Sequence, residues 1–283
     1  MIRVLVVDDS PTARLLITKT LESDAGIRVV GTAEDGNEAV RFAKALRPDL
    51  ITMDVRMPRL NGLMATEQIM AGSPTPILIV SSSVDAPDLQ ITFRALQAGA
   101  LDVIEKPKAL TAEGFDAMRD RLVDRVKAMA EIRVVGRRAP AGGFPVIAPS
   151  SRRYHLITIG ASTGGPQLLE QILRGLPDKF PAPILLVQHM TPGFTAGFVR
   201  WLKQDCRVQV KLADDGEPLL PGSVYVAPDG KHLRVAANWK AGLGLEPAGL
   251  FRPSIDVLFE SAATVVGSSA VGLLLTGMGS DGT

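Results

Sequence analysis

The chain has 283 residues, of which 46% are hydrophobic, with 31 basic and 30 acidic side chains. That length favours two domains, and a net charge of +1 argues against a protein dedicated to binding nucleic acid. The apolar run after Met1 ends at Asp8 and is too short for a signal peptide. No apolar stretch reaches the roughly 18 residues that span a membrane. We therefore expect a cytoplasmic protein with neither a nucleic-acid partner nor direct membrane insertion.

The first part of the chain alternates short apolar runs with amphipathic stretches. Pro11 fits the first position of a helix, and Pro48 ends another before the next apolar run. The runs have the length of buried parallel strands and lie at residues 4–7, 27–30, 50–53, 77–80 and 103–104. This order predicts a doubly wound, flavodoxin-like α/β domain over residues 1–130.

A second α/β pattern follows a stretch rich in turn residues. Residues 136–151 contain many glycines, prolines and serines and lack periodic apolar positions, so we expect an interdomain linker at 131–152. Further apolar strands are expected at residues 155–159, 184–187, 224–226 and 270–275. Residues 153–283 should therefore form a second doubly wound parallel-sheet domain of Rossmann-like type.

Three acidic residues of the first domain follow predicted strands. Asp8 and Asp9 come after the first strand and Asp54 after the third, so a doubly wound sheet brings all three to one edge. Such a cluster suits Mg²⁺, with the backbone carbonyl of Arg56 as a further ligand, and Lys106 can balance the charge of a phosphoryl group. Each acid alone would more often cap a helix, but the joint spacing favours a functional site.

Further residues around these acids match a known pattern. The matching positions are Asp8-Asp9, Asp54, Met57-Pro58, Gly62, Ser81 and Lys106-Pro107. The domain resembles the response-regulator receiver family, which implies that a histidine kinase phosphorylates Asp54 in the presence of Mg²⁺ bound by Asp8, Asp9 and Asp54. The resemblance also implies that Ser81 and Lys106 sense the phosphoryl group. Val103 stands where many receivers carry a switching aromatic residue, so an aromatic relay is not expected.

The second domain contains a candidate serine nucleophile. Ser162 lies in the GxSxG pattern of residues 160–164, between an apolar strand and a helical segment. A serine on such a turn is exposed to substrate, and amides at the helix N-terminus face an oxyanion that forms beside it. A glycine turn that binds phosphate or a dinucleotide is the alternative, although the segment lacks a full GxGxxG and a P-loop lysine.

A serine nucleophile needs a base and a residue that orients the base. Among the three histidines, His189 ends a buried strand, whereas His155 starts one and His232 falls in a predicted turn. Asp281 follows the strand at 270–275. The sequence therefore predicts that Ser162, His189 and Asp281 meet at one sheet edge as a triad, since triads are recognised by geometry rather than by chain order.

Longer motifs make the resemblance of the whole chain specific. They lie at residues 160–166, 188–190, 193–195, 227–230, 252–259 and 276–282. The chain resembles the chemotaxis protein-glutamate methylesterases, whose receiver covers the active site until it is phosphorylated. The resemblance implies hydrolysis of γ-glutamyl methyl esters on chemoreceptors with release of methanol, possible deamidation of receptor glutamines, and no cofactor for ester hydrolysis. It also implies an oxyanion donor at the amide of Met278 and a lining role for Thr163.

Two further expectations concern the catalytic domain. Family members continue beyond the position of Thr283, which comes two residues after Asp281, so we expect this domain to be C-terminally incomplete. The alternative to an enzyme is a non-enzymatic docking module of the chemosensory complex, gated by the receiver. A transcription factor is disfavoured because the second half shows no helix-turn-helix pattern.

Overall fold

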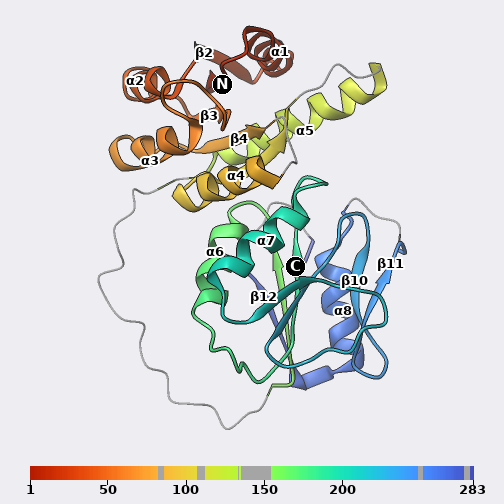
Figure 1. The fold of residues 1–283 in the computed structure, drawn as a ribbon. Coiled ribbons are helices and arrows are strands. Elements are labelled where there is room, and N and C mark those ends of the chain that lie inside the picture. The colour runs from red at the N-terminus through yellow and green to blue at the C-terminus, as the bar shows by residue number, and fades with distance from the viewer. Residues whose placement is uncertain (82–85, 107–111, 133, 135–153, 248–250, 277–280) are drawn as a thin grey trace. The chain divides into compact units, whose positions relative to one another are not determined.

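The computed structural model describes residues 1–81, 86–106, 112–132, 134, 154–247, 251–276 and 281–283. The chain divides into two compact units, Met1–Ala141 and Gly142–Thr283 (Figure 1). The expected linker at 131–152 lies largely outside the described residues, so its boundaries stay a prediction. Within the described ranges, no helix combines the length and the apolar character needed to cross a membrane.

The first unit contains a five-stranded sheet in the order β2-β1-β3-β4-β5, with all neighbours parallel. The strands are β1 (Ile2–Val7), β2 (Ile27–Ala33), β3 (Leu50–Met53), β4 (Ile77–Ser81) and β5 (Asp102–Glu105). Every residue of β3 and β4 is buried, as expected for central strands that are covered on both faces. The predicted doubly wound fold of this unit is confirmed.

Five helices flank this sheet (Figure 1). They are α1 (Pro11–Glu22), α2 (Gly36–Leu46), α3 (Gly62–Gly72), α4 (Ala86–Ala98) and α5 (Ala112–Ala130). Side chains of Ser10, Asp35 and Asn61 accept hydrogen bonds from the first turns of α1, α2 and α3. Apolar residues of α1 and α5 share one core with alternate residues of β1, so these two helices cover one face of the sheet.

The second unit contains another parallel sheet, in the order β12-β6-β7-β9-β8. Its strands are β6 (Leu156–Ala161), β7 (Ile184–Gln188), β8 (Gln209–Leu212), β9 (Ser223–Val226) and β12 (Ala270–Leu274). An antiparallel hairpin of β10 (His232–Ala236) and β11 (Lys240–Gly244) lies outside that sheet. The parallel-sheet prediction is confirmed, whereas β8, β10 and β11 were not predicted.

Helix α8 of the second unit packs against both the parallel sheet and the hairpin. The helices here are α6 (Gly165–Arg174), α7 (Thr195–Asp205), α8 (Ile255–Val265) and the short 3₁₀ helix η1 (Gly267–Ser269). Apolar residues of α8 share a core with β6, β7 and the β10–β11 hairpin. A Cβ atom at Gly160 would lie 2.3 Å from Cγ2 of Ile255, so the glycine lets the first turn of α8 approach the end of β6.

Gly62 provides a test of the local packing in the first unit. A Cβ atom at Gly62 would lie 2.0 Å from the carbonyl oxygen of Asp54, whereas one at Gly72, the last residue of the same helix, meets no atom within 4 Å. Because the obstructing atom belongs to the backbone, we expect Gly62→Ala to destabilise the first unit by about 1–3 kcal/mol. Gly72→Ala should be neutral or slightly stabilising.

Urea unfolding of the full chain measures both variants. The tryptophans, Trp201 and Trp239, both belong to the second unit, so their fluorescence reports that unit while circular dichroism reports both. Gly62→Ala should move the unfolding of the first unit, seen by circular dichroism, to lower urea concentration. The fluorescence transition, which reports the second unit, should not change. An unchanged dichroism transition would contradict the predicted clash.

Candidate functional site

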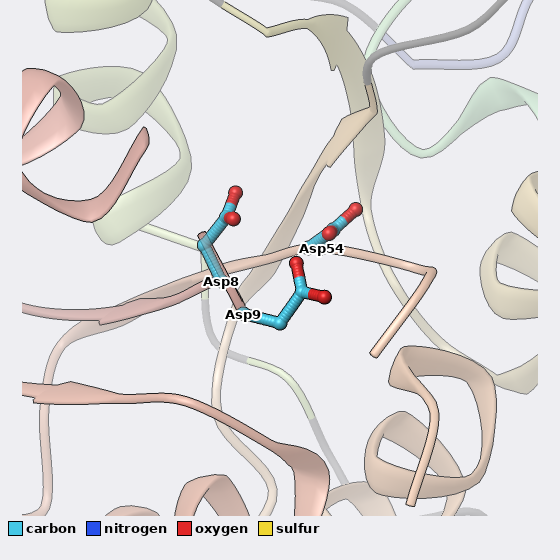
Figure 2. A group of neighbouring side chains, drawn as sticks. All are labelled: Asp8, Asp9 and Asp54. Carbon is cyan, nitrogen blue, oxygen red and sulfur yellow. The ribbon is translucent and has the colours of Figure 1, made fainter. Parts of the chain in front are cut away.

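Three carboxylates gather at the carboxyl edge of the first sheet. Asp8 follows β1 and Asp54 follows β3, and these strands are paired neighbours with Val7 opposite Met53. One ligand oxygen from each of Asp8, Asp9 and Asp54 lies within 4.8 Å of the others (Figure 2). Asp8 and Asp54 are buried, whereas Asp9 is exposed. The edge therefore presents a buried acidic pair with a third acid on its solvent side.

Lys106 joins the two buried carboxylates. Its Nζ atom lies 2.7 Å from Oδ2 of Asp8 and 2.8 Å from Oδ2 of Asp54. The backbone amide of Lys106 donates to the carbonyl of Ser81 at 2.7 Å, so the ends of β4 and β5 bring Ser81 to the same edge. The structure thus brings together Asp8, Asp54, Ser81 and Lys106, as the strand order predicted.

Burial and charge oppose each other at Asp54. Burial raises the pKa of Asp54 to about 6, against the lowering effect of Lys106, and the negative charge of Asp8 adds to the rise. The pKa of Lys106 is also raised: burial acts against its charge, but the two carboxylates outweigh that effect. The three carboxylates outnumber the cations that contact these residues in the described part of the chain, Lys106 and Arg14, whose guanidinium donates to the carbonyls of Asp8 and Asp9. The remaining negative charge can be neutralised by a hard divalent cation.

Arg56 adds one contact to this site. Its backbone amide lies 3.4 Å from Oδ1 of Asp54, so the segment after β3 folds back over the carboxylate. The expected metal contact of the Arg56 carbonyl stays a prediction.

In the second unit, Ser162 follows β6 on a tight turn. Its backbone amide donates to the carbonyl of Thr276 at 2.9 Å, and the amide of Gly165 donates to the carbonyl of Ser162 at 2.8 Å. Gly164 caps α6 with a φ of 76°, a left-handed conformation that favours glycine. Ser162 and Thr163 are both buried, directly before the first turn of α6. The strand-turn-helix context predicted from GxSxG is present, but the expected exposure of the serine is wrong, since Ser162 is only 5% exposed.

Gln188 connects the turn of Ser162 to that of His189. Its Nε2 atom donates at 2.8 Å to the carbonyl oxygens of both residues. A Cβ atom at Gly165 would lie 2.1 Å from Oε1 of Gln188, so the glycine makes room for the buried amide. The sequence motif contained Gln188, but this role depends on a contact between strand ends and was not predicted.

His189 and Asp281 form a close pair. Nε2 of His189 lies 2.9 Å from Oδ2 of Asp281, with both side chains nearly buried. β6 and β7 are paired with Ala161 opposite Gln188, and the amide of His189 donates to the carbonyl of Ala161 at 2.8 Å. Ser162 and His189 therefore follow directly opposed residues of neighbouring strands, which run about 5 Å apart.

An aromatic ring covers the imidazole. Phe251 stacks on His189 with ring centroids 4.9 Å apart and an angle of 10° between the planes. Stacking restricts rotation of the imidazole and shields one face of it from water. Phe251 precedes the motif at 252–259, and nothing in the sequence pattern distinguished it from an ordinary loop aromatic.

Asp281 is held by the first turn of α8. Ile255 and Asp256 donate backbone hydrogen bonds to it at 2.7 and 3.0 Å, and the Ser254 hydroxyl donates to Oδ1 at 2.7 Å. Burial acts to raise the pKa of Asp281, but these donors and the nearby His189 outweigh it, so the pKa is lowered. A helix N-terminus thus keeps this buried carboxylate ionised.

The remaining residues are the two expected to bind or line the site, Met278 and Thr163, and the two other histidines. Met278 lies outside the described residues, so its expected role as an oxyanion donor stays a prediction, as does the lining role of Thr163. His155 precedes β6 at the opposite edge of the sheet. The prediction that His232 lies in a turn is wrong: it is the first residue of β10 and is fully buried.

Comparison with known proteins assigns both units to families. Residues 4–113 match the response regulator receiver domain, and residues 157–283 match the CheB methylesterase domain. A protein-glutamate methylesterase/protein-glutamine glutaminase of Syntrophus aciditrophicus is 48% identical to this chain, over all of the chain and 83% of the relative. The chain belongs to the family of protein-glutamate methylesterases/protein-glutamine glutaminases. A Myxococcus xanthus member is 45% identical over 99% of the chain and 82% of the relative.

Family membership confirms the resemblance that the sequence motifs suggested. The acidic site lies in the receiver domain and the Ser162 site in the methylesterase domain of the same chain.

The lowered pKa of Asp281 predicts a pH-dependent contribution to stability. A carboxylate with a depressed pKa in the folded state stabilises the fold above its unfolded pKa, and this contribution is lost as the pH falls through the folded value. Asp281→Asn should therefore lower the free energy of unfolding at pH 5, and the difference from the wild type should shrink below about pH 4. Urea unfolding followed by tryptophan fluorescence measures this difference. A gap that stays constant down to pH 3 would contradict the assignment.

Proposed function

We propose that this chain is a phosphorylation-activated protein-glutamate methylesterase, which hydrolyses γ-glutamyl methyl esters on chemoreceptors and also deamidates receptor glutamines. The proposal places its action in the cytoplasm, on the cytoplasmic helices of the receptors. The observation that carries it is the pairing of His189 with Asp281, beside the strand end that bears Ser162. The names and the extent of the similar proteins support the same substrate class.

The pairing supports a role for each residue in the proposed reaction. Nε2 of His189 lies 2.9 Å from Oδ2 of Asp281, and we assign Nδ1 as the nitrogen that accepts the proton of Ser162. The serine oxygen attacks the ester carbonyl, and the protonated imidazole, stabilised by the Asp281 carboxylate, donates its proton to the leaving methoxide. Methanol leaves, and water activated by His189 hydrolyses the acyl-serine. For a glutamine substrate the leaving group is ammonia.

The tetrahedral intermediate requires donors near Ser162. The first two residues of α6 offer no free donor, because the Gly165 amide donates to the Ser162 carbonyl and Pro166 has no N–H. The proposed donor is therefore the amide of Met278, which lies outside the described residues. Each such donor contributes about 100- to 1000-fold to the rate. No metal or cofactor takes part in the proposed hydrolysis.

The receiver supplies the control. Asp54 is the proposed phosphoacceptor, with a chemotaxis histidine kinase as the phosphodonor. The residues present fit Mg²⁺, because the carboxylates of Asp8, Asp9 and Asp54 converge while one ammonium group offsets only part of their charge. When bound, the ion neutralises charge that develops on the transferred phosphoryl group. Lys106 and Ser81, at the same edge, are the proposed contacts of that group after transfer.

Replacing the nucleophile tests the catalytic assignment. Ser162→Ala should reduce methanol release from methylated chemoreceptor membranes by at least about 10⁴-fold, because the covalent step is lost. The matched control is Ser268→Ala, which changes an exposed serine of η1 in the same unit. Methanol release that survives Ser162→Ala would contradict the nucleophile assignment, whereas a wild type that releases no methanol would favour the docking-module alternative.

Replacing the phosphoacceptor tests the regulatory assignment. A small phosphodonor with Mg²⁺ should raise the rate of methanol release by the wild type and leave that of Asp54→Asn unchanged, since the amide cannot form the acyl phosphate. Asp116→Asn, which changes an exposed acid of α5, should still respond. Chelation of Mg²⁺ should abolish the response of the wild type. Stimulation of Asp54→Asn equal to that of the wild type would refute the assignment.

A further inference from the structure

His232 is fully buried at the start of β10 and makes two polar contacts. Its Nε2 atom lies 2.9 Å from the carbonyl oxygen of Pro247, and its Nδ1 atom lies 3.1 Å from the backbone nitrogen of Ser254. A carbonyl oxygen can only accept and an amide can only donate, so Nε2 carries the proton and Nδ1 is bare. Both contacts are satisfied by a single tautomer of the neutral imidazole.

Ser254 transmits this contact to the candidate active site. Its amide is fixed by His232, while its hydroxyl donates to Oδ1 of Asp281 at 2.7 Å and accepts from the amide of Val257 at 3.3 Å. Asp281 in turn lies 2.9 Å from His189. A continuous series of contacts therefore runs from the buried hairpin histidine to the catalytic base.

We propose that His232 is a positioning residue for the esterase reaction, which acts through Ser254 and Asp281 to hold His189. The inference rests on the proposed function and adds to it a residue that touches neither the substrate nor the base. Physically, the bare Nδ1 of His232 fixes the residue that caps α8, and the cap fixes the carboxylate that orients the imidazole. Partners of this kind typically change activity by about 10- to 100-fold when they are lost.

A second link between the hairpin and α8 supplies a matched control. The amide of Val235 donates to the Ser261 hydroxyl at 3.0 Å, so Ser261→Ala removes a hydrogen bond between the same two elements two turns farther along the helix. If the hairpin served only to stabilise α8, loss of either link would affect activity alike. Positioning through Ser254 requires that only the His232 link affects turnover.

Two variants of His232 separate its two contacts. In His232→Asn the side-chain oxygen replaces Nδ1 and can accept from Ser254, whereas in His232→Gln the longer amide replaces Nε2 and can donate to Pro247. We expect kcat for methanol release to fall about 10- to 100-fold in His232→Gln with KM within about twofold of the wild type. His232→Asn should recover most of that loss, and Ser261→Ala should leave kcat unchanged.

Tryptophan fluorescence in urea shows whether each variant is folded. On a Ser254→Ala background, His232→Gln should cost little further activity, because the contact that it transmits is already gone. The proposal is overturned if His232→Gln turns over like the wild type, or if His232→Asn and Ser261→Ala lose as much kcat as His232→Gln.

Failure of the proposed function gives a different result. It appears as a wild type that releases no methanol, or as release that persists in Ser162→Ala. The inference can then still be judged from the proton resonance of His189 Nε2, which reports the contact with Asp281 without turnover. That resonance should change in His232→Gln and not in Ser261→Ala; the same spectrum in both variants would overturn the proposal.

Discussion

The second unit depends on a buried carboxylate held at the N-terminus of one helix. Asp281 receives two backbone hydrogen bonds from the first turn of α8 and one from the hydroxyl of Ser254. Burial alone would favour the protonated acid, which could not stabilise a charged imidazole. Because the helix donors lower the pKa of Asp281, the carboxylate stays charged at neutral pH and can act on His189.

The two carboxyl-edge sites solve the same electrostatic problem differently. Asp54 has few donors to offset its burial, so its pKa rises to about 6 although Lys106 lies close to it. Asp281 has a full set of donors, so its pKa falls. An added cation would stabilise the charged carboxylate of a site like that of Asp54. Such a site suits an acid whose charge changes on phosphorylation. A site like that of Asp281 is complete without an ion, which suits a fixed catalytic orientation.

Much of this arrangement could be predicted from the sequence, because parallel strands present their carboxyl ends at one edge. Asp8 and Asp54 in the first unit, and Ser162 and His189 in the second, each follow a strongly apolar run, so their convergence followed from strand order alone. The doubly wound folds followed from the same runs.

The remaining features depend on packing that no local pattern records. β8, β10 and β11 are short, and each leaves residues partly exposed, so their apolar pattern is weak. His232 seemed to lie in a turn because the residues before it are Asp229, Gly230 and Lys231, but it becomes buried when the hairpin packs on α8. The stacking of Phe251 on His189 likewise joins a loop to the end of a strand that is distant in the sequence.

The proposed mechanism depends on the orientation of the His189 ring, which nitrogen-15 NMR of the imidazole can measure. When the His189 imidazole is neutral, we predict that Nε2, which lies 2.9 Å from the Asp281 carboxylate, carries the proton and that Nδ1 is unprotonated. The Nε2 signal should move in Asp281→Asn, and the Nδ1 signal should move in Ser162→Ala. The opposite tautomer, with the proton on Nδ1 and an Nε2 signal that does not change in Asp281→Asn, would contradict the proposed mechanism.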